Sequence, residues 1–129
     1  MKKKLLMGLA SVFVLAACGN GATEESDTIK LGGNFELSGG ASAYGTLMDE
    51  GIKMAVAEQN AADGLLGKEI EYISYDNKSE PSESTSVATR LATEDNVVAI
   101  LGPATTGAAN AQSPAVTRAT VPAILPAAT

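Results

Sequence analysis

Histidine and tryptophan are absent from this 129-residue chain, and cysteine occurs once, as Cys18. Without histidine, the chain has no Ser-His-Asp triad, no imidazole acting as general acid or base, and no histidine metal ligand. A single cysteine cannot form a disulfide within the chain. These absences argue against the common forms of hydrolytic and metal-dependent catalysis, and we expect a protein that is not an enzyme.

Signatures of phosphate and cofactor binding are missing as well. The chain has no Gly-x-x-x-x-Gly-Lys-Ser/Thr loop and no Gly-x-Gly-x-x-Gly fingerprint. Positive charge is scarce, because six lysines and arginines stand against fifteen aspartates and glutamates after Cys18, which gives a net charge of −9. A chain this acidic is a poor partner for nucleic acid. We therefore expect no cofactor and no nucleic-acid partner.

The N-terminus has the organisation of an export signal. Three lysines at positions 2–4 precede an apolar run over residues 5–17, which is shorter than the roughly 20 residues that a membrane-spanning helix needs. The run ends in a Leu-Ala-Ala triplet before Cys18, which resembles the lipobox of bacterial lipoproteins. We predict a lipoprotein signal peptide over residues 1–17 and a lipid on Cys18, which would anchor the protein on the extracytoplasmic face of the cell membrane. An ordinary secretory signal with an incidental cysteine is the alternative.

Residues 18–27 are small and polar and have too little apolar surface to order themselves, so we predict a flexible tether there. From residue 28 onward, strand-like and helix-like patterns alternate. The predicted strands cover residues 29–37, 69–75, 97–101 and 121–125, and the predicted helices cover residues 43–60, 81–94 and 106–117. This alternation predicts an α/β fold of order β-α-β-α-β-α-β, a parallel sheet with helices on both faces.

Some details of these elements are specific enough to test. Asp49 in the first helix is expected in solvent, and residues 97–101 form a continuous apolar run, which is typical of a strand buried on both faces. The third helix contains Pro114, which weakens its helical pattern. The apolar positions expected on the inner face of the first helix are Met48, Ile52, Ala55 and Val56.

Candidate binding residues follow the predicted strands, because ligands of open parallel sheets bind beyond the carboxyl ends of the strands. Thr105 and Thr106 stand at the expected start of the third helix, where free N–H groups and the helix dipole attract a carboxylate or phosphate. Simple N-capping by one of the two hydroxyls is the alternative. The segments that lie at this edge are residues 38–45, 102–107 and 126–129.

Two further residues at this edge have open roles. Tyr44, between Ala43 and Gly45, is either a wall of a pocket or an apolar contact that holds the turn. Asp76 follows the second strand and is either a polar ligand group or a turn former.

Five short motifs occur in order and together cover nearly all of residues 29–129. They are Leu37-Ser38-Gly39 with Ala43-Tyr44-Gly45, Gly64-Leu65-Leu66-Gly67-Lys68, Tyr75-Asp76 with Pro81, Ile100-Leu101-Gly102-Pro103, and Pro126-Ala127-Ala128-Thr129. In this order they resemble the branched-chain amino acid binding proteins, the solute receptors of bacterial ABC transporters. The resemblance implies a two-lobed periplasmic-binding-protein fold.

The resemblance also implies roles for individual residues. Thr106 matches the position that binds the ligand carboxylate, and Thr129 matches a second position that holds the polar groups of the amino acid. Ala127 matches a carbonyl that accepts from the ligand ammonium, and Tyr44 lines the pocket. Together with Thr105 at the helix N-terminus, these residues make up the predicted ligand-binding site.

The implied function is capture of a small amino acid, leucine, isoleucine or valine, for import through an ABC permease. The disulfide of the family's first lobe has no counterpart, because Asn77 or Lys78 and Thr105 stand near the expected cysteines. Family members continue well beyond this length, so residues 28–129 resemble a truncated first lobe without the second lobe's carboxylate for the ligand ammonium. The alternatives are a sensor domain of the same fold and an exported α/β enzyme with its catalytic residues elsewhere.

Overall fold

The computed structural model describes residues 28–129, so the predicted signal peptide, Cys18 and the tether lie outside the described residues. Seven elements alternate along the chain, as the sequence predicts. They are β1 (Thr28–Phe35), α1 (Ser42–Ala61), β2 (Glu69–Asp76), α2 (Pro81–Thr93), β3 (Ala99–Leu101), α3 (Thr106–Ala119) and β4 (Ala123–Ile124).

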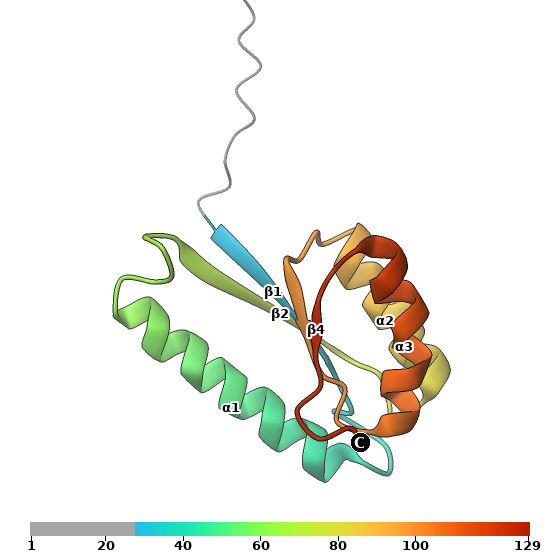
Figure 1. The fold of residues 1–129 in the computed structure, drawn as a ribbon. Helices are drawn as coiled ribbons and strands as arrows, with labels where there is room; N and C mark the ends of the chain where they lie inside the picture. The colour runs from blue at the N-terminus through green and yellow to red at the C-terminus, as the bar shows by residue number, and fades with distance from the viewer. Residues whose placement is uncertain (1–27) are drawn as a thin grey trace, which may run out of the picture.

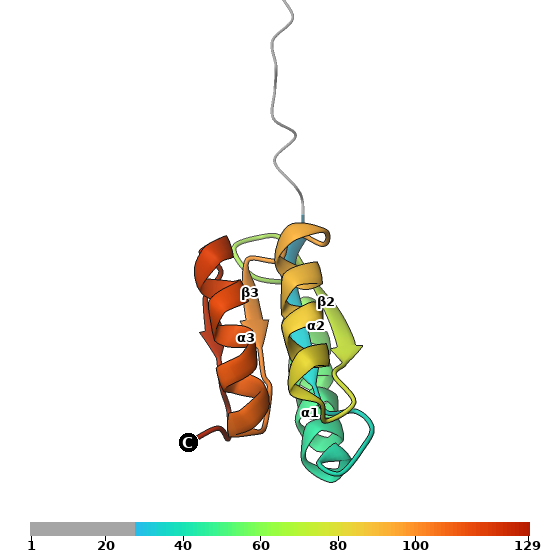
Figure 2. The same ribbon diagram turned by 90° about the vertical axis from the view of Figure 1, so that its right-hand side faces the viewer.

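The four strands form one parallel sheet in the order β2-β1-β3-β4. Helix α1 lies against one face, over β1 and β2, while α2 and α3 lie side by side on the other face (Figures 1 and 2). The predicted α/β fold with helices on both faces of a parallel sheet is therefore confirmed.

The strand order places a topological switch point between β1 and β3. From β1 the chain first crosses over α1 to β2 on one side, and then returns over α2 to β3 on the other side of β1. The segments that leave the carboxyl ends of β1 and β3 therefore diverge to opposite faces of the sheet, and the place where they diverge is where ligands of open parallel sheets bind.

The apolar core lies between the sheet and the α2–α3 layer. Leu91 and Ile100 are fully buried at its centre. Gly32 of β1 leaves room for Leu91, whose Cδ atoms would lie 3.0 Å from a Cβ at that position. Helices α2 and α3 also share a hydrogen bond from the Thr85 hydroxyl to the Ala111 carbonyl at 2.8 Å. These contacts fix α3, and with it the start of α3 at the edge of the sheet.

A buried polar network joins β1 to α2 and α3. The Asn34 amide donates to the Ser84 carbonyl and hydroxyl, each at 3.0 Å, and to Gln112 Oε1 at 2.9 Å. Asn77 donates to Asn34 Oδ1 at 3.1 Å, and Gln112 donates to the Gly102 carbonyl at 2.8 Å. Because such groups are costly to bury without partners, this network holds the loops after β1, β2 and β3 in one arrangement.

Strand boundaries differ from the prediction by one or two residues. The first strand ends at Phe35 rather than residue 37, and β3 and β4 are shorter than predicted. Residues 97–101 are predicted to form a strand that is buried on both faces. Val97 is buried but Val98 is 57% exposed, so this prediction is wrong. Val98 precedes β3 and lies beside Thr28, Lys30 and Asn96, at the end of the sheet where β1 begins.

Asp49 is the clearest error of the sequence analysis. It is 2% exposed instead of solvated, and its carboxylate accepts from the Tyr72 hydroxyl at 2.8 Å and from the Ser74 hydroxyl. Lys53, one turn later, lies 2.6 Å from the same carboxylate. The two hydroxyls on the β2 surface thus find their acceptor on α1. Burial raises the pKa of Asp49, but Lys53 and the hydrogen bonds from Ser74 and Tyr72 outweigh that effect and lower the pKa below its ordinary value.

Helix α1 otherwise buries most of the predicted face, and α3 is longer than predicted. Met48, Ile52 and Val56 are half-buried, whereas Ala55 is exposed and does not belong to the face. Helix α3 continues through Pro114, which is exposed, so the missing N–H lies on the solvent side. Within residues 28–129, no helix is both long and apolar enough to span a membrane, and no side chains are grouped to hold a metal ion.

Candidate ligand-binding site

The candidate site lies at the carboxyl ends of the strands, where the segments after β1, β3 and β4 meet. Glu36, the first residue after β1, is fully buried beneath the start of α3. Its Oε2 accepts from the Ala104 amide at 3.0 Å, and its Oε1 accepts from the Thr105 amide at 3.1 Å and the Thr105 hydroxyl at 2.7 Å. Glu36 therefore satisfies donors at the N-terminus of α3 that would otherwise lack partners.

This arrangement tests the capping alternative for the two threonines. Thr105 is the N-cap residue of α3, but its side chain makes no capping hydrogen bond, because its hydroxyl donates to Glu36. Thr106 is exposed, and its hydroxyl points to the C-terminal segment rather than to the helix. The capping alternative is therefore wrong for both residues.

Two residues predicted from different motifs come together here. The Thr106 hydroxyl accepts from the Thr129 amide at 3.1 Å and donates to the Thr129 carbonyl at 3.2 Å. The residues lie 23 positions apart in the chain. Ala127 and Tyr44 are both exposed at the same end of the molecule, with Tyr44 in the first turn of α1 and 67% exposed. The exposure of the Tyr44 side chain does not fit an apolar contact that holds the turn. The binding roles of Tyr44, Thr106, Ala127 and Thr129 stay predictions.

Asp76 organises the segment that leads from β1 to Tyr44. Its Oδ1 accepts from the amides of Leu37 at 2.9 Å, Ser38 at 3.1 Å and Lys78 at 2.7 Å, and its Oδ2 accepts from the Ser38 hydroxyl at 2.6 Å. The bond to Lys78 agrees with the turn-forming reading. Partial burial raises the Asp76 pKa, but the hydrogen bonds from Ser38, Lys78 and Leu37 outweigh it and hold the pKa below its ordinary value.

Ser79 makes a second connection between the same two segments. Its hydroxyl donates to the Ser38 carbonyl at 2.7 Å and accepts from the Ala41 amide at 3.1 Å. Asp76 and Ser79 therefore both bind the segment between β1 and α1. The position of the first turn of α1 depends on these contacts.

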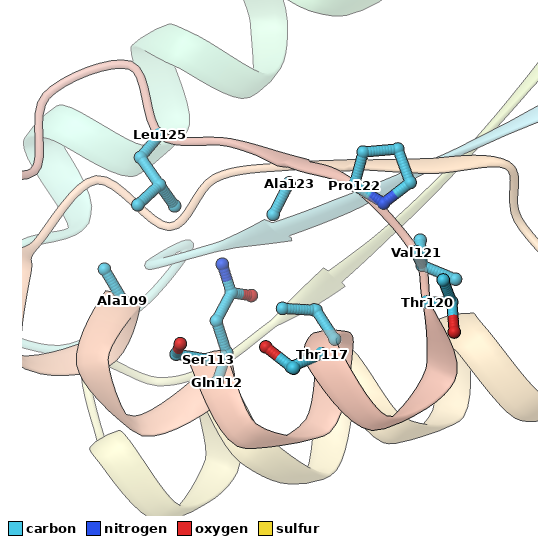
Figure 3. A pocket seen from close by; sticks show the side chains of 10 residues that line it. Ala109, Gln112, Ser113, Thr117, Thr120, Val121, Pro122, Ala123 and Leu125 are labelled. Carbon is cyan, nitrogen blue, oxygen red and sulfur yellow. The ribbon is translucent and has the colours of Figure 1, made fainter.

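A groove of about 570 Å³ lies between α3 and β4, beside the candidate site rather than in it (Figure 3). It is lined largely by apolar atoms, among them those of Val116, Val121 and Leu125. The groove shares no residue with the predicted site. The predicted residues instead form an open surface, which suits one side of a site that a second body completes.

Glu36 is the functional candidate that the sequence analysis missed. It stands just past the end of β1, a strand that also contains Lys30 and Asn34, so the sequence carries no distinct signal of its role. Its partners at positions 104 and 105 are separated from it by more than 60 residues, so the contact follows from the strand order alone.

A parallel sheet with this switch point, and with hydroxyls and backbone amides gathered at its carboxyl edge, is typical of an α/β domain that binds a ligand at that edge. Residues 28–129 match the periplasmic binding protein family, and the chain belongs to it.

Within this family, the chain is similar to proteins that are named as binding branched-chain amino acids. The chain is 52% identical to the branched-chain amino acid transporter substrate binding protein LivJ from Streptococcus pneumoniae, whose crystal structure is a complex with isoleucine; the TM-score is 0.78 over 79% of this chain and 29% of that one. It is 32% identical to the leucine binding protein LivK from Thermotoga maritima, with a TM-score of 0.73 over 78% of this chain and 28% of that one. It is also 32% identical to Leu/Ile/Val-binding protein homolog 2 from Brucella abortus, over 79% of this chain and 26% of that protein. The chain thus spans between a quarter and a third of the length of these relatives.

Proposed function

We propose that this chain forms the first part of lobe one of an extracytoplasmic receptor that captures amino acids, branched-chain ones in particular, for import by an ABC transporter. The observation that carries the proposal is the meeting of Thr106 with Thr129 at the N-terminus of α3, on the carboxyl edge of the sheet. The similarity to the isoleucine-bound LivJ of S. pneumoniae supports the choice of ligand class. In this role the protein is a binding protein and not an enzyme.

The geometry suggests how the ligand carboxylate would bind. Because Glu36 takes the amides of Ala104 and Thr105, the amides that remain for a ligand are those of the first turn, beginning with Thr106. The Thr106 hydroxyl would exchange its contact with Thr129 for the carboxylate. A bound amino acid would then lie between α3 and the segment after β4, with the Ala127 carbonyl as an acceptor for the ammonium and Tyr44 as a wall.

A second lobe would complete the site by closing over this surface. The exposure of Tyr44, Thr106, Ala127 and Thr129 fits a surface that one lobe presents before closure. A permease in the same membrane would receive the ligand from the closed receptor.

The proposal is tested by calorimetric titration of the receptor that contains this chain. Leucine, isoleucine and valine should each bind at one site, whereas glutamate and lysine, matched in the α-carboxylate and α-ammonium, should bind far more weakly. Equal binding of all five amino acids, or of none, would contradict the proposed function.

Membrane anchoring is a separate part of the proposal and rests on the signal sequence and Cys18. The variant Cys18→Ala should be released from membranes, because it lacks the thiol that would carry the lipid. Detergent-phase partitioning measures this directly, and a Cys18→Ala protein that still enters the detergent phase would refute lipidation.

A further inference from the structure

Glu36 places a negative charge directly beneath the candidate site. Its side chain is 0% exposed, so the charge is shielded from water. All of its hydrogen-bond partners are neutral, namely the amides of Ala104 and Thr105 and the Thr105 hydroxyl. The carboxylate is therefore stabilised by dipoles and not neutralised by a cation.

Among residues 28–129, no cation at this edge is available to offset that charge. Of the segments that follow β1, β2, β3 and β4, only the one after β2 contains a basic residue, Lys78. The Lys78 ammonium lies 3.6 Å from Glu83 and is already paired. The described residues therefore contribute a net negative charge to the candidate site before any ligand binds.

The N-terminus of α3 supplies a partial positive charge that two anions would have to share. A helix N-terminus is equivalent to roughly half a positive charge. Glu36 already uses this field through the amides at its start. A ligand carboxylate at Thr106 would bring a second full negative charge to the same helix end, and the two carboxylates would repel each other. A ligand that also carries an ammonium relieves the repulsion, because its net charge is zero.

We infer that Glu36 is a specificity-determining residue, which makes the site select zwitterionic ligands over monoanions that have the same side chain and carboxylate but lack the ammonium. This inference rests on the proposed amino acid binding function. It is independent of any ammonium partner on a second lobe, because it predicts a change in ligand preference when only Glu36 is altered. Glu36 acts through the field at the helix end and does not touch the ligand.

The test compares leucine with its 2-oxo acid, 4-methyl-2-oxopentanoate, on the receptor that contains this chain. The ratio of the two dissociation constants is measured by calorimetry for the parent protein and for Glu36→Gln, which keeps the length and one acceptor oxygen but removes the charge. The dissociation constant of the 2-oxo acid should fall relative to that of leucine by about tenfold in Glu36→Gln, which lies within the range of charge effects at partly buried helix ends. Glu36→Met, unbranched and neutral, is the second variant and should shift the ratio in the same direction.

The matched control is Glu71→Gln, which removes one charge from an exposed position in β2 and should leave the ratio unchanged. An unchanged ratio in a neutral Glu36 variant that melts as one transition overturns the inference but leaves the proposed function intact. Failure of both neutral variants to fold would show a purely structural role and would also overturn it. If the parent receptor binds no leucine at all, the proposed function fails first, and the inference fails with it.

Discussion

At the scale of single residues, Thr106 combines exposure, a helix N-terminus and a backbone contact with a second predicted site residue. A hydrogen bond to a charged group is typically worth about 1.5–3 kcal/mol. The variant Thr106→Ala should therefore weaken leucine binding roughly ten- to a hundredfold in the receptor, whereas Thr106→Ser, which keeps the hydroxyl, should bind nearly like the parent. Calorimetric titration beside a melting curve for each variant measures both effects. A Thr106→Ala protein that binds leucine normally would remove Thr106 from the site.

Asp76 gives a prediction for pH dependence. Its pKa in the folded state lies below its ordinary value of 3.8, so the carboxylate stabilises the fold at any pH above that ordinary value. This contribution is lost as the pH falls through the lowered pKa. The parent should therefore melt at a higher temperature than Asp76→Asn at pH 7, and the difference should shrink below about pH 4. Melting curves between pH 3 and pH 7 test this, and a difference that grows on acidification would be the wrong sign.

Burial of individual carboxylates was the main limit of the sequence analysis at this scale. The proximity of Thr106 and Thr129 followed from motifs that each end a strand. Glu36 and Asp49 could not be assigned in the same way, because each is buried by donors from distant parts of the chain: Thr105 is 69 residues from Glu36, and Tyr72 is 23 residues from Asp49. A sequence pattern shows that a carboxylate is present, but only the strand order shows which donors surround it.

At the scale of secondary-structure elements, two glycines of α1 should respond to the same substitution in opposite ways. A Cβ at Gly45 would lie 2.2 Å from the Glu36 carbonyl oxygen, so Gly45→Ala must displace either α1 or the end of β1. Such overpacking costs about 1–3 kcal/mol. A Cβ at Gly51 would meet nothing within 4 Å, and Ala is favoured over Gly in a helix by about 0.8–1 kcal/mol.

Chemical denaturation of the two variants measures this contrast. Gly45→Ala should unfold at a lower denaturant concentration than the parent, and Gly51→Ala at a higher one. Both variants add the same methyl group to the same helix. A common upward shift would contradict the close approach of Gly45 to Glu36, and a common downward shift would contradict the open space around Gly51.

Element type and order were predictable because the periodicities are strong, and boundaries were not. The first strand was extended to residue 37 because Leu37 continues the apolar alternation. In the structure the chain leaves the sheet after Phe35, since Leu37 and Ser38 donate their amides to the side chain of Asp76 instead of to the backbone of a neighbouring strand. Side-chain acceptors from another segment thus ended the strand where its own pattern did not.

At the scale of the whole molecule, the β4 side is the least protected part of the described chain. Strand β4 pairs only with β3, Ile124 is 61% exposed, and the apolar groove between α3 and β4 is open. Uncovered edges of this kind destabilise a sheet and favour association. The isolated polypeptide 28–129 should therefore melt with a broad transition below about 50 °C, near the lower end of the mesophilic range. Differential scanning calorimetry at two protein concentrations checks this, and one sharp transition well above that temperature would contradict it.

The direction of the strands also sets how an anchored receptor would stand on its membrane. Strand β1 begins at Thr28, and residue 129 lies at the opposite end of the molecule (Figure 1). The eight residues of β1 separate the two ends by about 26 Å. With a lipid on Cys18, the membrane would lie on the side of the molecule opposite the carboxyl edge of the sheet, and the candidate site at that edge would face away from the membrane. In the proposed lipoprotein, the ten residues 18–27 would span at most about 35 Å, which would allow the proposed receptor to rotate and present its binding edge to a permease while it stays attached to the membrane.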